Sequence, residues 1–192
     1  MKTTRNIAFI ALFTAILCIL SPLSIPLGTL VPISLATLAV YIIGALLDFK
    51  RAPICVILYI IIGMMGMPVF SGFEGGIAKL IGPTGGFIFG YILGVFAESL
   101  LISWKKDKIY IYPIAMVVAT LFIYLFGCIW FMVYFVQAGN PKDFSAVMMS
   151  CVVPFLLGDS IKIVVATLAS FKLRKPLDRA LSVPERKKSA TN

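Results

Sequence analysis

Six apolar stretches run along the chain, separated by short charged segments or by segments rich in proline and glycine. They cover roughly residues 7–27, 30–48, 52–67, 84–103, 109–136 and 145–171. A helix needs about 20 residues to cross a ~30 Å hydrocarbon layer, so each stretch predicts a transmembrane helix. The third is short for a full crossing, and the fifth and sixth are long enough for extra turns. We expect an all-α membrane protein with one domain over 1–192, a compact bundle of six transmembrane helices.

Composition supports a membrane protein. Hydrophobic residues make up 60% of the 192 residues and charged residues 13%, with a mean hydropathy of +1.04. Soluble domains are about half apolar and a quarter charged. The apolar stretch after Met1–Arg5 is followed by no small-x-small cleavage site, so we expect a retained first helix and not a signal peptide.

The basic residues predict the orientation in the membrane. With the N-terminus inside, 14 of the 17 Lys and Arg residues fall in cytoplasmic segments, as the positive-inside rule requires. Both termini are then cytoplasmic, and a solvated basic tail covers about residues 172–192. Topology and attraction to anionic lipid explain the net charge of +9, so we expect no nucleic-acid partner.

The residue inventory argues against an enzyme. The chain has no histidine, which removes the usual general base and the commonest metal ligand. Its four cysteines lie far apart in apolar runs without a Cys-x-x-Cys pair, so no metal site or disulfide framework is indicated. We predict no catalytic residues, no metal and no cofactor.

Two charged residues interrupt the last apolar stretch. Asp159 and Lys162 are three residues apart and share a helix face, and each is expensive near the bilayer centre. An ion pair that only fixes helix packing is one reading. However, Pro154 and Gly158 should interrupt or start the helix just before the pair, and irregular backbone at this depth is tolerated where it lines a cavity. A ligand pocket is the favoured reading.

A glycine-rich segment from Gly63 to Gly90 connects the third and fourth stretches. Loops of this length are commonly binding loops. Its part from Gly82 through Pro83, Thr84 and Gly85 to Gly86 opens the fourth helix, so backbone amides and the Thr84 hydroxyl are candidate donors to a ligand. It lacks the residue order of a P-loop.

Two further features stand out within the helices. Ala8, Ala11 and Ala15 form a small-residue stripe on the first helix that would allow another helix to approach closely. Glu98 lies within the fourth stretch, and no role is assigned to it.

Taken together, these residues resemble the biotin-specific S components of energy-coupling-factor (ECF) transporters, the BioY family. The resemblance covers nearly the whole chain. Its motifs are Ala11-x-x-x-Ala15, the stretches Ile25–Leu27 to Leu38–Val40, Gly66–Phe70, Gly82–Phe87, and Pro154-Phe155-Leu156-x-Gly158-Asp159-x-x-Lys162. The chain departs from the family at Leu157, where a proline is common, and at Ala36, where a glutamine is common.

The resemblance implies a multi-pass protein of a prokaryotic cell membrane that captures biotin and has no ATPase of its own. A transmembrane T component and two ABC-type ATPases would complete the transporter. The first-helix face of Ala8, Ala11 and Ala15 would meet the T component.

Biotin fits the candidate residues. Asp159 can accept from its ureido N–H groups, and Lys162 can meet either the ureido oxygen or the carboxylate. The aromatic residues expected to pack on its rings are Tyr41, Phe70, Phe87 and Tyr91. Three alternatives remain at this stage: an S component for another vitamin, an ion-coupled secondary transporter, and, last, an intramembrane enzyme.

Overall fold

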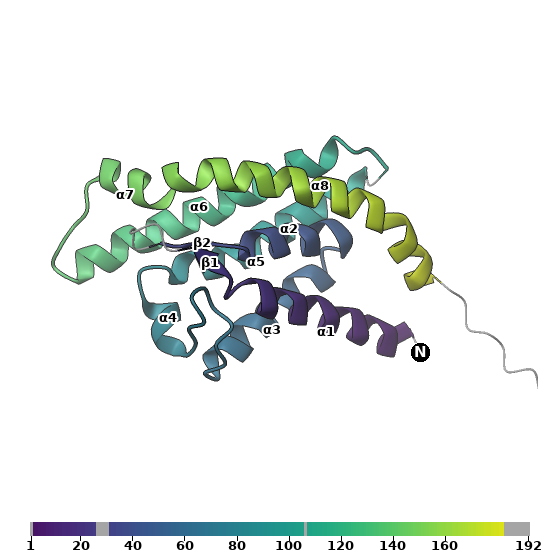
Figure 1. Ribbon diagram of the computed structural model, residues 1–192, viewed down its shortest axis with the longest axis horizontal. Helices are drawn as coiled ribbons and strands as arrows, with labels where there is room; N and C mark the ends of the chain where they lie inside the picture. The colour runs from purple at the N-terminus through teal and green to yellow at the C-terminus, as the bar shows by residue number, and fades with distance from the viewer. Residues whose placement is uncertain (1, 26–30, 106, 183–192) are drawn as a thin grey trace, which may run out of the picture.

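The computed structural model describes residues 2–25, 31–105 and 107–182, and these form a helical bundle with one small hairpin (Figure 1). The helices are α1 (Lys2–Leu20), α2 (Ala36–Leu46), α3 (Arg51–Met64), α4 (Ile77–Ile81), α5 (Gly85–Trp104), α6 (Ile111–Gln137), α7 (Phe144–Cys151) and α8 (Val153–Ser182). Strands β1 (Ser24–Ile25) and β2 (Ile33–Ser34) pair antiparallel. The last ten residues of the predicted tail, and residues 26–30 at the ends of the first two predicted spans, lie outside the described residues.

Among the described residues, three helical segments are long and apolar enough to cross a membrane: Gly85–Trp104, Ile111–Gln137 and Phe144–Leu177. Three shorter apolar helices, Thr4–Leu20, Ala36–Leu46 and Arg51–Met64, correspond to the first three predicted stretches. The prediction of a mainly helical, membrane-type chain is therefore confirmed.

Three predicted elements have different bounds. The first helix ends at Leu20 and not near residue 27, because the chain turns there and enters β1. The second helix begins at Ala36 and not near residue 30, because β2 and Pro32 hold the preceding backbone extended. The last helix continues to Ser182, through Pro176, so residues 172–182 of the predicted tail are helical.

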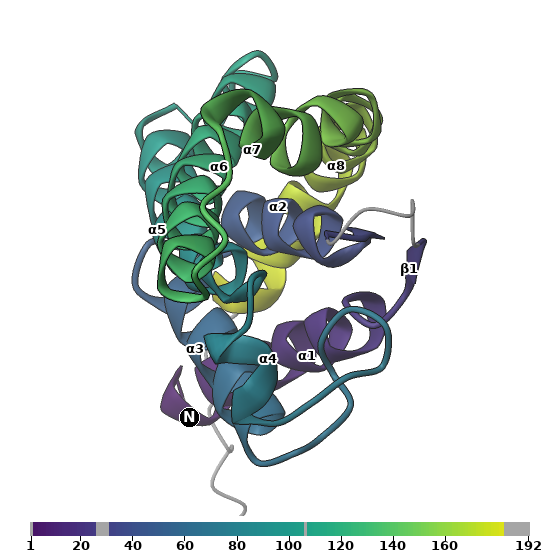
Figure 2. The same ribbon diagram turned by 90° about the vertical axis from the view of Figure 1, so that its left-hand side faces the viewer.

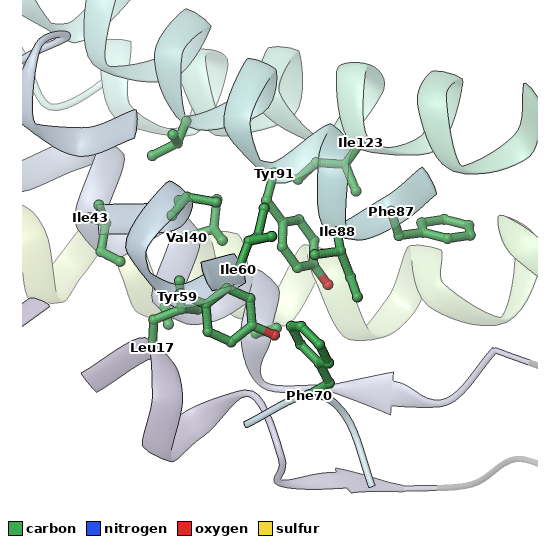
Figure 3. Close-up of a cluster of buried hydrophobic side chains, with 14 of the residues drawn as sticks. Leu17, Val40, Ile43, Tyr59, Ile60, Phe70, Phe87, Ile88, Tyr91 and Ile123 are labelled. Atoms are coloured by element: carbon green, nitrogen blue, oxygen red, sulfur yellow. The ribbon is translucent and has the colours of Figure 1, made fainter. Parts of the chain in front are cut away.

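Helix α2 is the central element of the bundle (Figure 2). Eight of its eleven residues are buried, and it packs against α1, α5 and α8. A large apolar core surrounds it, and Figure 3 shows Leu17, Val40, Ile43 and Tyr59 in this core together with Ile88 and Tyr91 of α5. This arrangement places one short helix between the first and last helices of the chain.

The outer faces of the long helices are apolar. On α6, Leu121, Leu125 and Ile129 are each more than half exposed at a spacing of four residues, and on α8 the same holds for Leu157 and Ile161. A helix with an apolar face on the core side and another on the outside is typical of a lipid environment.

Helices α5 and α6 make the most extensive contact in the bundle. Gly86, Gly90 and Gly94 recur every four residues on the α5 face, and a Cβ on any of them would press on α6. At Gly90 it would lie 3.1 Å from Cα of Ile123. Small residues thus let the two backbones approach closely.

Candidate ligand site

Helix α8 starts where the sequence predicts. The chain turns at Val152, which has φ −126° and ψ −60°, between the end of α7 and the first residue of α8. Pro154 is tolerated in the first helical turn because an N–H there has no intrahelical partner. Gly158 lies inside the helix and does not break it. The break before α8 places its first turns beside α2 and the hairpin.

Asp159 and Lys162 form an ion pair on this part of α8. Lys162 Nζ lies 2.9 Å from Asp159 Oδ1. Lys162 is 8% exposed and Asp159 is 4% exposed. Lys162 Nζ also donates to the Ser34 carbonyl at 2.8 Å and to Thr37 Oγ1 at 2.9 Å. These are three hydrogen bonds, as many as an ammonium group can donate.

The Asp159 carboxylate has partners from two further helices. Thr37 Oγ1 on α2 donates to its Oδ1 at 3.1 Å, and the Tyr124 hydroxyl on α6 donates to its Oδ2 at 2.7 Å. A carboxylate has about four acceptor positions, and the hydrogen bonds that the described residues make fill two on Oδ1 and one on Oδ2. Oδ2 therefore keeps capacity for one more donor.

A small cavity opens beside these groups. Its polar lining consists of Ser34, Thr37, Ser71, Thr84, Asp159 and Lys162. Its apolar and aromatic lining consists of Val31, Pro32, Phe87, Ile88, Tyr91, Ile123, Tyr124 and Phe155. The ion pair is thus not satisfied by its two members alone, and it faces a chamber.

The structure brings five of the predicted ligand residues together around this cavity: Thr84, Phe87, Tyr91, Asp159 and Lys162. Figure 3 shows Phe87 and Tyr91 projecting from the same helix.

The remaining glycine-segment residues lie next to the cavity. Gly82 and Pro83 line a neighbouring pocket with Thr84, and the Gly82 carbonyl accepts from Trp130 Nε1 at 2.9 Å. A Cβ on Gly85 would overlap the Leu80 carbonyl, and one on Gly86 would overlap Trp130. These two glycines allow close packing at the start of α5.

Two of the predicted aromatic residues lie in the core and are absent from the cavity lining. Tyr41 is fully buried, and its hydroxyl lies 2.6 Å from Thr120 Oγ1. Phe70 is fully buried with its ring edge-on to Tyr59, at a centroid distance of 5.4 Å (Figure 3).

Sequence reasoning missed Thr37 and Tyr124, which contact the charges directly. Thr37 is polar in an otherwise apolar run, which was an available signal, but hydroxyl groups in such helices often bond only to their own backbone. Tyr124 has no such signal, because it is one of several aromatic residues in α6.

Known proteins resemble this chain over most of its length. The model of the BioY family matches residues 1–179. The chain belongs to the BioY family. The "Biotin transporter BioY" of Thermotoga maritima is 36% identical over 171 residues, covering 89% of this chain and 96% of that protein. "Biotin transporter BioY2" of Lactococcus lactis subsp. cremoris is 34% identical over 183 residues, covering 92% and 95%.

A solved structure also resembles this BioY-family chain. The crystal structure of the S-component for biotin from an ECF-type ABC transporter superposes with a TM-score of 0.80 and 27% identity, and the match covers 90% of this chain and 92% of that one. The resemblance inferred from the motifs is confirmed, and the chain is a membrane protein with the S-component fold.

Three other sequence features of this BioY-family member can be placed. Ala8, Ala11 and Ala15 are all exposed on α1. Glu98 is completely buried in α5 and lies against Gly44 of α2, away from the residues that line the cavity. The four cysteines are free thiols, two buried and two partly buried.

Proposed function

We propose that this chain is the substrate-specific S component of an ECF transporter, and that it binds biotin in the cavity beside Asp159 and Lys162. The observation that carries the proposal is the free acceptor capacity of Asp159 Oδ2 at the wall of a chamber that is mainly apolar and aromatic. Biotin presents the complementary groups, a ureido N–H donor on an apolar bicyclic body.

The surrounding contacts fix the acceptor in place. Lys162, Thr37 and Tyr124 hold the carboxylate from three helices, so its charge is balanced and its orientation is set before a ligand arrives. A preorganised polar group loses little freedom on binding, which favours high affinity. Phe87, Tyr91 and Phe155 provide flat apolar surface for the rings.

The proposal includes the topology predicted from the basic residues, with six helices crossing the membrane and both termini in the cytoplasm. The start of α1 and the end of α8 lie at one end of the bundle, together with the α2–α3 and α5–α6 connections (Figure 1). Lys50 and Lys105 lie in these connections, and Arg51 begins α3. Helices α4 and α7 lie at the other end. Segregation of basic residues to one end supports this orientation in a cell membrane.

We propose further that a T component and two ABC-type ATPases complete the transporter and supply its energy. The exposed stripe of Ala8, Ala11 and Ala15 supports a helix-docking face on α1. A pull-down of the tagged chain in mild detergent should recover all three partner subunits. Ala11→Leu should reduce this recovery, whereas Leu12→Ala, at an exposed neighbouring position, should not.

Calorimetric titration tests the ligand. The purified protein in detergent should bind biotin saturably and should not bind riboflavin or thiamine. Asp159→Asn and Lys162→Ala should each weaken biotin binding by about tenfold or more, because a hydrogen bond to a charged group contributes about 1.5–3 kcal/mol. Ser160→Ala is a matched control, since Ser160 is exposed on the same helix and its hydroxyl donates to the Leu156 carbonyl.

Two results would count against this assignment. Unchanged biotin affinity in both charge variants would reject the site, and preferred binding of another vitamin would reject the ligand. Uptake by this chain alone in vesicles, abolished by collapse of the proton gradient, would favour the ion-coupled alternative instead.

A further inference from the structure

A second, polar pocket adjoins the biotin cavity. It is lined by Glu74, Gly75, Ala78, Lys79, Gly82, Pro83 and Thr84, and we call it the side pocket. Thr84 lines both spaces. They are also linked through the turn that holds Ser71 of the cavity and Glu74 of the side pocket, which is closed by a 2.9 Å hydrogen bond from Phe70 N to the Glu74 carbonyl. A ligand in the cavity thus has the side pocket as its neighbour.

The side pocket contains one ion pair with unequal members. Lys79 Nζ lies 3.0 Å from Glu74 Oε2, and the Lys79 side chain is 13% exposed while that of Glu74 is 58% exposed. The cation is therefore held in the wall, whereas the carboxylate stands mostly in solvent. An ion pair with such an exposed partner contributes little to stability, so another carboxylate can replace that of Glu74.

Lys162 is poorly suited to receive a ligand carboxylate. Its three N–H donors already bond to the Ser34 carbonyl, Thr37 Oγ1 and Asp159 Oδ1. The ureido group and the carboxylate of biotin lie at opposite ends of the molecule. A molecule whose ureido group meets Asp159 therefore directs its carboxylate away from the ion pair on α8.

We infer that Lys79 receives the carboxylate of the ligand, and that Glu74 occupies the position of that carboxylate until the ligand replaces it. This inference rests on the proposed biotin function and adds a specificity-determining residue to it. Lys79 then selects ligands with a free carboxylate, and Glu74 opposes their binding by competing for the same cation.

Removing the charge of Lys79 and removing that of Glu74 should have opposite effects on biotin affinity. Titration calorimetry of the full chain measures both effects with biotin and with biotinamide, in which a neutral amide replaces the carboxylate. Lys79→Met should weaken biotin binding about tenfold and change biotinamide binding less than about twofold. Glu74→Gln should strengthen biotin binding roughly a few-fold, because it removes the carboxylate that competes for Lys79. It should have little effect on biotinamide binding. Lys142→Met is the matched control: Lys142 also lies at the α4 and α7 end, but its ammonium packs 5.2 Å from the Phe135 ring centroid.

The outcomes separate this inference from the function on which it rests. If wild-type protein binds biotin but Lys79→Met affects biotin and biotinamide equally, Lys79 does not contact the carboxylate and the inference is wrong. If Lys79→Met does not fold, Glu74→Gln decides by itself, since unchanged biotin affinity in that variant contradicts the competition. Wild-type protein that binds neither compound would reject the proposed function and the inference together.

Discussion

The side-chain oxygen of Thr37 on α2 lies 3.1 Å from Oδ1 of Asp159 on α8, and its hydroxyl group donates a hydrogen bond to that carboxylate. The same oxygen accepts from Lys162 Nζ at 2.9 Å. Thr37 therefore bridges both members of the ion pair and ties α8 to the central helix. Its position at the cavity wall means that it orients the groups proposed to meet biotin.

Thr37→Val keeps the shape of the side chain and removes both hydrogen bonds. We expect about tenfold weaker biotin binding. Each lost hydrogen bond is to a charged group and contributes about 1.5–3 kcal/mol, and the Asp159 carboxylate also loses one of the contacts that orient it. Thr37→Ser keeps the hydroxyl and should stay within about threefold of wild type. Titration calorimetry measures both, and a valine variant with wild-type affinity would contradict the bridging role.

The sequence predicted the helical segments well because apolar runs near 20 residues have few alternatives in a membrane protein. The error at the second helix arose where Pro32 and a two-residue strand pairing, which hydropathy does not register, take up the first residues of the run. The extension of α8 beyond Lys172 was missed because basic residues mark a membrane boundary and not the end of a helix.

The site was predictable to the extent that it contains charge. Asp159 and Lys162 stand out because an ionised group within an apolar run requires a reason. Thr37 and Tyr124 do not stand out, since their role depends on which helices become neighbours. Tyr41 and Phe70 are aromatic residues of apolar runs, and hydrophobicity alone does not distinguish a cavity wall from the core.

Gly86 allows α5 to lie against α6, so a methyl group there should destabilise the bundle. A Cβ at this position would lie 2.7 Å from the Phe126 carbonyl oxygen and would also overlap Trp130. Gly86→Ala should cost about 1–3 kcal/mol and lower the melting temperature in detergent by several degrees, roughly. Gly158→Ala is the control, because its Cβ would meet only Ile33 side-chain atoms at 3.9 Å and alanine is favoured in a helix. Equal melting temperatures for the two variants would show that the α5–α6 contact relaxes freely.

Asp48 in the α2–α3 connection should make stability sensitive to acid. Partial burial acts to raise the pKa of its carboxyl, but hydrogen bonds from the Arg51 side chain and backbone, with the Arg51 charge, outweigh burial and hold the pKa below its usual value. The ion pair measures 2.9 Å, and Arg51 also bonds to Asn6 on α1. Because the folded-state pKa is lowered, the stabilisation is complete above the unfolded pKa of about 3.9 and is lost as pH falls through the folded value.

A comparison with Asp48→Asn isolates this contribution. Between neutral pH and about pH 3, the melting temperature of the wild type should fall by more than that of Asp48→Asn, which cannot titrate at this position. Thermal unfolding in detergent across this range measures the difference. Parallel curves for the two proteins would mean that the Arg51 contacts add no pH-dependent stability.

Glu98 should destabilise the bundle at its present position. Its side chain is completely buried in α5, and neither carboxylate oxygen has a hydrogen-bond partner among the residues that the structure describes. Gly44 of α2 leaves room for it, since a Cβ there would lie 2.6 Å from Oε2. A buried polar group without a partner costs about 1–3 kcal/mol.

Glu98→Met replaces the carboxylate with an apolar group of similar length, and we expect the melting temperature in detergent to rise by a few degrees, roughly 2–4 °C per kcal/mol. Glu98→Gln keeps polar atoms in the same space and should gain less. Biotin affinity should not change in either variant, because Glu98 does not line the cavity. A methionine variant that melts lower than wild type would contradict this account, because the carboxyl group would then stabilise the bundle.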